Sequence, residues 1–244
     1  MASLTSSARL KIKIILFVIL LLNGGLWYTT HNIQPKWPGV PPVPSYKGSL
    51  MMSLSDTQFS YRLGALTLQN IGDTGGRVTP LKEYDYQALN KWFELLWALD
   101  NNSSHVPLIV AYYFGAVRDN PESIRVVIDY LAKVGDNPRG ENWRWLAQAV
   151  FLAKYRLENL DLAMDLAVRL ANIKLPHGEL PMWARHMPAF ILEAQGDKDA
   201  AIAFVEAILT TTKNLHPNEI NFMLSFLEER LGVDVKKRYG LDYK

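Results

Sequence analysis

The sequence predicts an all-helical protein with one N-terminal transmembrane helix, about four pairs of helices and a final capping helix. Two observations support this fold class. Apolar residues recur at positions i, i+3, i+4 and i+7, as on the buried side of an amphipathic helix. Polar or proline-containing breaks separate these stripes, and no segment alternates as a strand does. A content of 49% hydrophobic residues in 244 is ordinary for a packed domain.

The first thirty residues predict a membrane anchor. Arg9, Lys11 and Lys13 precede an apolar stretch, and residues 12–30 are just long enough to span a bilayer. The positive-inside rule places basic flanks in the cytoplasm. We therefore expect residues 1–11 to be cytoplasmic and the bulk of the chain to be periplasmic, with the anchor in a bacterial inner membrane.

Two alternatives to a retained anchor stay open. A cleaved signal peptide has the same basic start and apolar middle, although its small-x-small cleavage site is not obvious here. The nearest approach to such a site is Asn23-Gly24-Gly25. The segment would also suit a hydrophobic helix buried in a partner.

The charge and the cysteine content limit the function classes. The formal net charge is +2, and the basic excess belongs to the leader, so no nucleic-acid partner is expected. The chain has no cysteine, which fits an exported domain that does not rely on disulfides.

A proline-rich segment follows the anchor. Residues 31–48 contain five prolines, a density that favours extended polyproline II and predicts a semi-rigid spacer. A proline-motif ligand for another protein is the alternative.

The helical stripes beyond this segment repeat. The second helix of each expected pair begins with a small or apolar residue, and these are Ala88, Ile124, Ala163 and Ala201. They recur at intervals of roughly 38 residues, which indicates an internal repeat of helix pairs.

Three stretches carry a resemblance to a known family. They are "YDYQALNKWFELLWALDNN" (Tyr84 to Asn102), "LENLDLAMDLAVRLANIKLP" (Leu157 to Pro176) and "GDKDAAIAFVEAIL" (Gly196 to Leu209). The chain here resembles the tetratricopeptide (TPR) family, whose helix pairs carry a small residue early in the second helix. The resemblance implies a TPR-like α-solenoid over residues 49–217, with repeats longer than the family's 34 residues. An irregular all-helical domain is the alternative.

Residues 218–244 are expected to form a capping helix and tail. The helix from Asn218 to Gly232 would close the open end of the solenoid. Its expected buried face consists of Ile220, Phe222, Met223, Phe226, Leu227 and Leu231.

The glycine-rich loop of residues 72–77 does not predict a phosphate site. It lacks the lysine and hydroxyl of a P-loop, and a helical run rather than a strand precedes it. Gly72 instead suits the left-handed position that ends a helix. The loop is interpreted as a plain connector or as a partner contact through Asp73 and Arg77.

No pattern in the sequence indicates catalysis. The five histidines lack metal-ligand spacing, although His177 and His186 flank one stretch. No G-x-S-x-G is present. We therefore expect no catalytic residue, no metal and no cofactor, and a protein that is not an enzyme; an enzyme acting on cell-wall polymer is the least favoured alternative.

The expected function is binding of other membrane or envelope proteins, as a scaffold or assembly factor. A permanent accessory subunit of a large membrane complex is the alternative. Residues 12–30 would contact lipid, and no small-molecule substrate is evident.

Trp143 and Trp145 fall on different helix faces, so one should be buried and the other partly exposed. The candidate partner-binding residues are Arg62, Asp73, Arg77, Tyr112, Arg144 and Arg185, because arginine and aromatic side chains often anchor interfaces and first helices line the concave surface of TPR-like proteins.

Overall fold

The computed structural model describes residues 6–31, 39–74, 77–212 and 215–240. The chain forms two compact units, Met1–Pro38 and Gly39–Lys244. In the first unit, the described residues form the helix α1 (Ser6–Thr30). Its segment Leu10–Thr30 is long and apolar enough to cross a membrane. By length and composition this helix fits a single membrane span, and it equally fits an N-terminal signal sequence.

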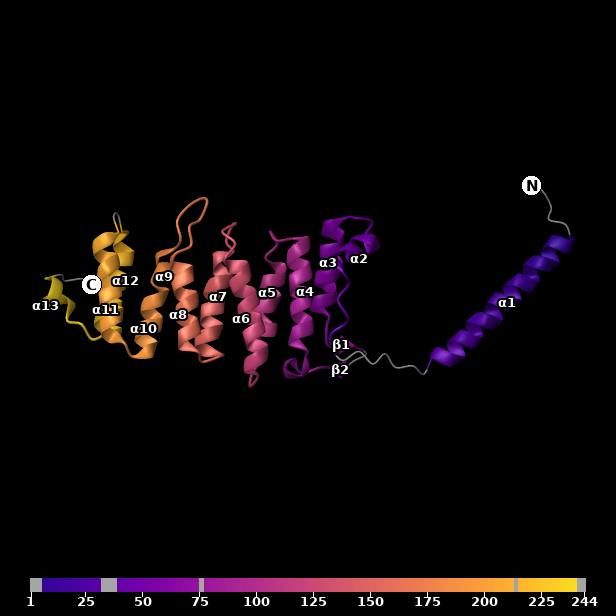
Figure 1. Ribbon diagram of the computed structural model, residues 1–244, viewed down its shortest axis with the longest axis horizontal. Coiled ribbons are helices and arrows are strands. Elements are labelled where there is room, and N and C mark those ends of the chain that lie inside the picture. Colours follow the sequence, from indigo (N-terminus) through magenta and orange to yellow (C-terminus); the bar gives the residue numbers. More distant parts are fainter. Residues whose placement is uncertain (1–5, 32–38, 75–76, 213–214, 241–244) are drawn as a thin grey trace. The chain divides into compact units, whose positions relative to one another are not determined.

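The second unit consists of short helices that lie side by side in chain order (Figure 1). The helices are α2 (Tyr46–Met52), α3 (Thr57–Gln69), α4 (Tyr86–Leu99), α5 (His105–Tyr112), α6 (Pro121–Gly135), α7 (Trp143–Tyr155), α8 (Leu160–Ala171), α9 (Met182–Arg185), α10 (Met187–Gln195), α11 (Lys198–Thr211), α12 (Pro217–Ser225) and α13 (Val235–Tyr239). Shorter helical segments are η1 (Leu81–Glu83), η2 (Phe114–Ala116) and the π-helical η3 (Phe226–Arg230). The predicted all-helical class is confirmed.

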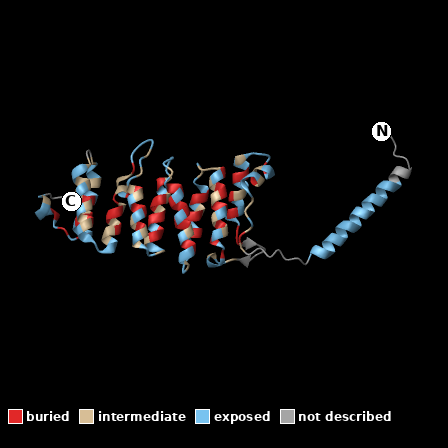
Figure 2. Cartoon of the chain, viewed as in Figure 1, coloured by how far each residue is buried: buried red, intermediate tan, exposed pale blue. Residues whose placement is uncertain are grey.

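Consecutive helices pack in pairs: α3 with α4, α5 with α6, α7 with α8, and α10 with α11. We call α3, α5, α7 and α9–α10 the first helices, and α4, α6, α8 and α11 the second helices. Helix α3 also contacts α5, α5 contacts α7, and α4 contacts α6. The first helices α3, α5 and α7 are therefore successive neighbours. Buried residues, red in Figure 2, occur in every helix from α3 to α11.

The second helices begin at side-chain caps that recur along the chain. In each case an Asp or Asn side chain accepts hydrogen bonds from backbone N–H groups of the first turn, which otherwise have no partner in the helix. The caps are Asp85, Asn120, Asn159 and Asp197. The residues before three of them, Asp119, Glu158 and Gly196, have a positive φ. The same turn therefore precedes α6, α8 and α11.

The small residues predicted at the approach of two helices are buried as expected. Ala163 and Ala201 have no exposed surface. Trp143 is buried and Trp145 half-buried, so the predicted division between the two tryptophans is confirmed. The core forms two hydrophobic clusters, one from Val40 to Ile191 and one from Ala189 to Val235.

The proline-rich segment is not a spacer over its whole length. Residues 32–38 lie outside the described residues, but the folded unit begins at Gly39. Val40 is buried in the core, and Trp92 Nε1 donates a hydrogen bond of 2.9 Å to Pro41 O. The helix α2 then begins at Tyr46. The prediction of a spacer over 31–48 is therefore wrong for residues 39–48, because Val40 is part of the core and the backbone of Pro41 is hydrogen-bonded to α4.

The glycine-rich loop contains a short hairpin that the sequence analysis did not expect. The strands β1 (Asp73–Thr74) and β2 (Arg77–Val78) are antiparallel, with Asp73 opposite Val78. Gly72 has a φ of 93°, so its predicted positive φ is confirmed. A Cβ on Gly72 would lie 1.4 Å from Tyr84 Oη, whose hydroxyl donates to Ile71 O.

The predicted capping helix is divided into α12 and η3. Most of its expected apolar face is buried or half-buried, including Met223 and Leu227. Phe222 is an exception, because 47% of it is exposed. The helix α13, which the sequence analysis did not predict, follows after Asp234, whose side chain accepts from Lys237 N.

Candidate functional site: an aromatic groove along the first helices

Exposed apolar side chains are distributed unequally between the two rows of helices. Within the described residues, the second helices expose one large hydrophobic side chain, Val168. The first helices and α12 expose Phe59, Leu63, Leu66, Leu108, Tyr112, Phe151, Tyr155, Trp183 and Phe222. Single exposed apolar residues need no explanation, but a set that gathers on one row of helices indicates an interaction surface.

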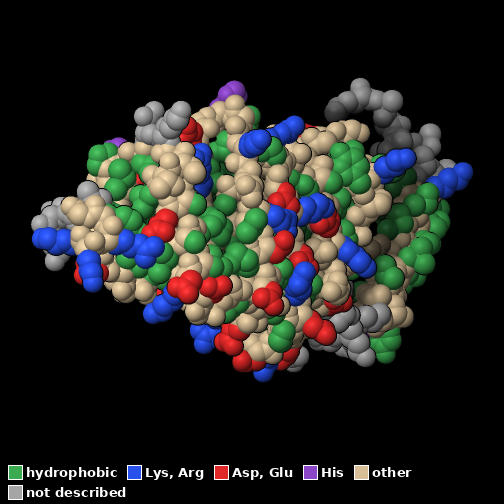
Figure 3. Space-filling model, turned by 60° about the vertical axis from the view of Figure 1, so that its left-hand side comes forward, with side chains coloured by type: hydrophobic (Ala, Val, Ile, Leu, Met, Phe, Trp, Pro, Cys, Tyr) green, Lys and Arg blue, Asp and Glu red, His purple; other side chains and the backbone are tan. Residues whose placement is uncertain are grey.

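Ion pairs link the second helices to one another. Lys133 on α6 pairs with Glu94 on α4, and Arg169 on α8 pairs with Asp136 at the end of α6. Such exposed pairs contribute little to stability, but they keep these helices well solvated. On the face shown in Figure 3, exposed hydrophobic side chains lie among charged groups of both signs.

The exposed aromatic side chains line a series of hollows. The largest, of about 610 Å³, lies between α5 and α7 and is lined by Leu108, Tyr112, Arg144 and Trp145, among others. A second hollow of about 250 Å³ shares Tyr112 and adds Phe151. The two hollows are therefore adjacent, with Tyr112 in the lining of both.

The series continues toward the C-terminus. The rings of Phe151 and Tyr155 lie 4.8 Å apart, and Tyr155 lines a third hollow of about 330 Å³ between α7, α10 and α12. Phe222 borders this hollow and also a fourth one, of about 250 Å³, that Trp183 lines. We call the four hollows together the aromatic groove.

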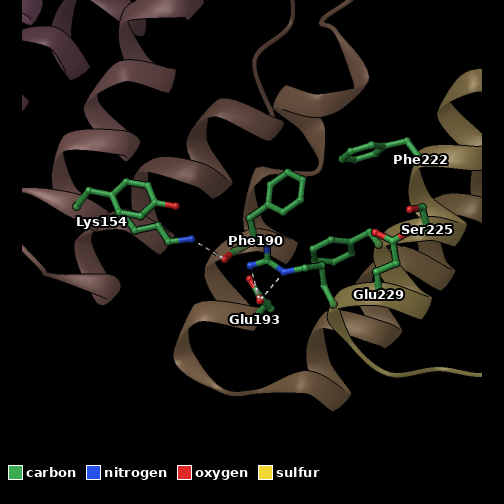
Figure 4. Close-up of a pocket in the computed structure, with 9 residues that line it drawn as sticks. Lys154, Phe190, Glu193, Phe222, Ser225 and Glu229 are labelled. Atoms are coloured by element: carbon green, nitrogen blue, oxygen red, sulfur yellow. Dashed lines mark hydrogen bonds and ion pairs between the residues drawn. The ribbon is translucent and has the colours of Figure 1, made fainter.

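The third hollow shows how the groove is held in shape (Figure 4). Lys154 Nζ donates a hydrogen bond of 3.2 Å to Phe190 O, and this links α7 to α10. The same ammonium group lies 5.0 Å from the centre of the Tyr155 ring. Arg230 on η3 donates to Glu193 Oε1 at 2.8 Å and 3.1 Å, which links η3 to α10. Contacts of this kind position aromatic rings without covering them.

The fourth hollow contains a buried histidine. His186 is 2% exposed, and neither of its ring nitrogens has a hydrogen-bond partner among the described residues. Its ring is parallel to that of Phe222, with 6.4 Å between the centres. The pKa of His186 is lowered to about 4, mainly by burial; the charge of Glu219 opposes this shift, and that of Arg185 adds to it. The imidazole is therefore neutral at pH 7.

The structure brings together two of the six predicted partner-binding residues. Tyr112 is 64% exposed and lines the groove next to Arg144. Arg144 also pairs with Glu141 at 2.7 Å, and its guanidinium lies 5.4 Å from the centre of the Trp143 ring. The predicted surface at this position therefore has both an aromatic and a cationic component.

The other four predicted residues lie elsewhere. Arg62 is exposed on α3, outside the four hollows. Arg185 is half-buried on α9, 3.9 Å from Glu179. Asp73 and Arg77 belong to the hairpin strands, and their side chains lie outside the described part of the chain.

Sequence reasoning missed most of the groove. Phe151, Tyr155 and Trp183 were not among the candidates, and Phe222 was expected in the core. The sequence of α7 does have apolar residues on more than one face of the helix, and this could have identified the surface. Phe151 and Tyr155 are exposed, whereas Leu152 and Ala153 beside them are buried. A helix that is apolar on two sides often packs on one side and binds on the other.

Within the groove, Tyr112 and Trp145 line the same hollow as Arg144. The described residues contain no group of three or more His, Asp or Glu side chains that would hold a metal ion. Aromatic rings beside arginine are the side chains that most often anchor protein interfaces. No known protein family, curated protein or solved structure matches this chain.

Proposed function

We propose that this protein is a membrane-anchored, TPR-like scaffold or assembly factor that binds a segment of another envelope protein in the aromatic groove. The main evidence is that exposed aromatic side chains lie on the first helices, whereas the exposed surface of the second helices is mostly polar. The recurrent Asx-capped turns before α6, α8 and α11 support a repeat architecture. On this proposal the protein is not an enzyme, and it needs neither a cofactor nor a metal.

The proposed anchor is residues 12–30, within α1, with residues 1–11 in the cytoplasm and the helical unit in the periplasm of a bacterium. The apolar length of Leu10–Thr30 supports a span, and the basic residues Lys11 and Lys13 at its N-terminal end support the orientation. A reporter enzyme fused after Lys244 tests this topology. It should be active only in the exported compartment, and activity in the cytoplasm would contradict the orientation.

Site-specific photocrosslinking in the full-length chain tests the binding surface. We expect a photoreactive amino acid at Tyr112 or Phe151 to crosslink to the same partner protein, because both side chains line adjoining hollows. Val168 is the matched control, since it is 43% exposed but lies on a second helix. Equal crosslinking at Val168, or different partners at Tyr112 and Phe151, would contradict a groove with one ligand.

Alanine substitutions provide the second test. Tyr112→Ala and Phe151→Ala together should weaken recovery of that partner at least tenfold, because interface aromatics often contribute 1–2 kcal/mol or more each. Val168→Ala should have no such effect. The circular dichroism of all variants should stay helical. A partner that stays bound to the wild-type protein in fixed stoichiometry through every purification step would instead indicate a permanent accessory subunit.

A further inference from the structure

The C-terminal end of α2 and the turn that follows it expose three long apolar side chains. Met51 is 81% exposed, Met52 is 76% exposed and Leu54 is 94% exposed. We call these three residues the apolar tip. Exposed apolar groups of this size lower solubility. A cluster of them therefore indicates a surface that is shielded from water when the protein is in its functional environment.

The backbone of this turn is held firmly in a conformation that directs the tip outward. Leu54 and Ser55 have φ values of 54° and 67°, in the left-handed region that residues with a side chain seldom adopt. Ser53 is 2% exposed. Its hydroxyl donates a hydrogen bond of 2.9 Å to Asp56 O within the turn. Ser55 N donates to Leu50 O at 2.7 Å. The exposure of Leu54 is therefore a property of a hydrogen-bonded turn.

The covalent connection to α1 limits which surfaces the apolar tip can contact. Only residues 31–38 separate α1 from the folded unit, and even a fully extended chain of that length reaches about 28 Å. Within such a tether the local concentration of bilayer surface around the tip is high. Methionine and leucine side chains that protrude suit a fluid apolar phase, because they need no complementary hollow. Tyr46, exposed at the start of α2, is a residue type enriched at membrane interfaces.

We propose that the apolar tip inserts into the interfacial layer of the lipid bilayer that holds α1, and so fixes a second point of contact between the helical unit and the membrane. The proposal rests on the retained anchor described under the proposed function. It is independent of the ligand of the aromatic groove. A second copy of this chain is the competing occupant, and it predicts contact between tips in place of contact with lipid.

The absence of cysteine from the sequence makes a direct test practical. Single substitutions Leu20→Cys, Leu54→Cys and Ala207→Cys would carry a fluorescent label in the full-length chain, reconstituted in vesicles of phosphatidylethanolamine and phosphatidylglycerol. Spin-labelled lipids then quench the label at a known depth. Leu20 lies within α1, and Ala207 is an exposed residue of α11, at the other end of the row of helices.

We expect the label at Leu54 to be quenched most by spin labels near the headgroups and the label at Leu20 by those near the bilayer centre, since interfacial segments lie only about 5–10 Å deep. The label at Ala207 should not be quenched. Quenching at Leu20 without quenching at Leu54 would overturn the tip proposal and leave the anchor standing. An unquenched Leu20 label would overturn both.

A second set of variants excludes an effect of the label itself. With Ser55→Cys as the labelled position, quenching should be present in the otherwise unaltered chain. It should be lost when Met51, Met52 and Leu54 are all replaced by glutamine, and restored by returning the three apolar residues. Quenching that persists in the triple variant would overturn the assignment to these side chains. Energy transfer between tips of different copies, without lipid quenching, would assign the surface to self-association.

Discussion

His186 combines nearly complete burial with two unpaired ring nitrogens, and this makes the fold sensitive to acid. Its folded-state pKa is about 4, against an ordinary value of 6.5. Between these two values the unfolded chain binds a proton that the folded chain does not. Stability is therefore full above pH 6.5 and falls as the pH decreases from 6.5 to 4, by at most roughly 3 kcal/mol from this residue.

The substitution His186→Leu tests this contribution. It should leave stability at pH 7.5 within about 1 kcal/mol, because an unpaired buried polar group is replaced by an apolar one. It should also reduce the stability loss between pH 7.5 and pH 4.5. Thermal unfolding of the detergent-solubilised chain, followed by near-ultraviolet circular dichroism, measures both effects. An equal acid-induced loss in the variant and the wild type would contradict the role of His186.

The sequence did not identify His186 or Phe222 as unusual, for a physical reason. Five scattered histidines predict turn or surface positions, and only the packing of α9 and α10 against α12 buries one of them. Phe222 is adjacent to Met223 on α12, and helical periodicity alone assigned both to one wide apolar face. The position of the neighbouring helices decides which edge of that face is covered.

The close approach of α6 and α7 depends on Gly135, at the end of α6. A Cβ at this position would lie 2.4 Å from Leu146 N and 2.8 Å from Leu146 Cα, which are backbone atoms that do not move aside freely. Gly135→Ala should therefore destabilise the protein by roughly 1–3 kcal/mol, the usual cost of overpacking. Urea unfolding of the purified chain measures the change.

Gly64, within α3, is the matched control. There the added Cβ would meet Leu96 Cδ2, the far end of a flexible side chain, at 2.6 Å. Alanine also favours helix over glycine by up to about 1 kcal/mol, so Gly64→Ala should change stability less than Gly135→Ala. Equal effects of the two substitutions would show that the backbone contact between α6 and α7 is not the determining factor.

The helices could be predicted from sequence more reliably than the irregular segments. Residues such as Ala163 and Ala201 fall within second helices as predicted, because an Asx cap and an apolar stripe are local signals. The hairpin after α3 was missed because its strands, Asp73–Thr74 and Arg77–Val78, are too short to show alternation. The Gly-Gly dipeptide in the sequence between them was the feature that could have predicted a hairpin.

At the scale of the whole molecule, the boundary of the folded unit differs from the predicted one in a testable way. A truncated chain of residues 39–244 keeps Val40 and the hydrogen bond from Trp92 to Pro41 O, whereas a chain of residues 49–244 loses both and also the first residues of α2. We expect the shorter chain to be less stable, by about 2 kcal/mol or more. Equal melting temperatures would mean that residues 39–48 do not stabilise the unit.

The candidate site was predictable only in part, because the aromatic groove is a property of several helices together. Tyr112 and Arg144 were found as single residues with interface character. Their continuity with Tyr155 and Phe222 depends on which first helices become neighbours, and residues far apart in the sequence meet only after the helices have packed. A local pattern contains no information about that arrangement.

The division of the core into two hydrophobic clusters has a dynamic consequence. Both clusters depend on α10, which contributes Ile191 to the first and Ala189 to the second. The second cluster is the smaller, and it includes α11 to α13. These helices should therefore open as a separate cooperative unit while α6 to α8 remain folded. Native-state hydrogen exchange at increasing denaturant would show a lower opening free energy for the amides of α11 than for those of α7. The third hollow lies between α7, α10 and α12. A partner bound across it would then slow hydrogen exchange in α11, because α11 to α13 could no longer open independently of α6 to α8.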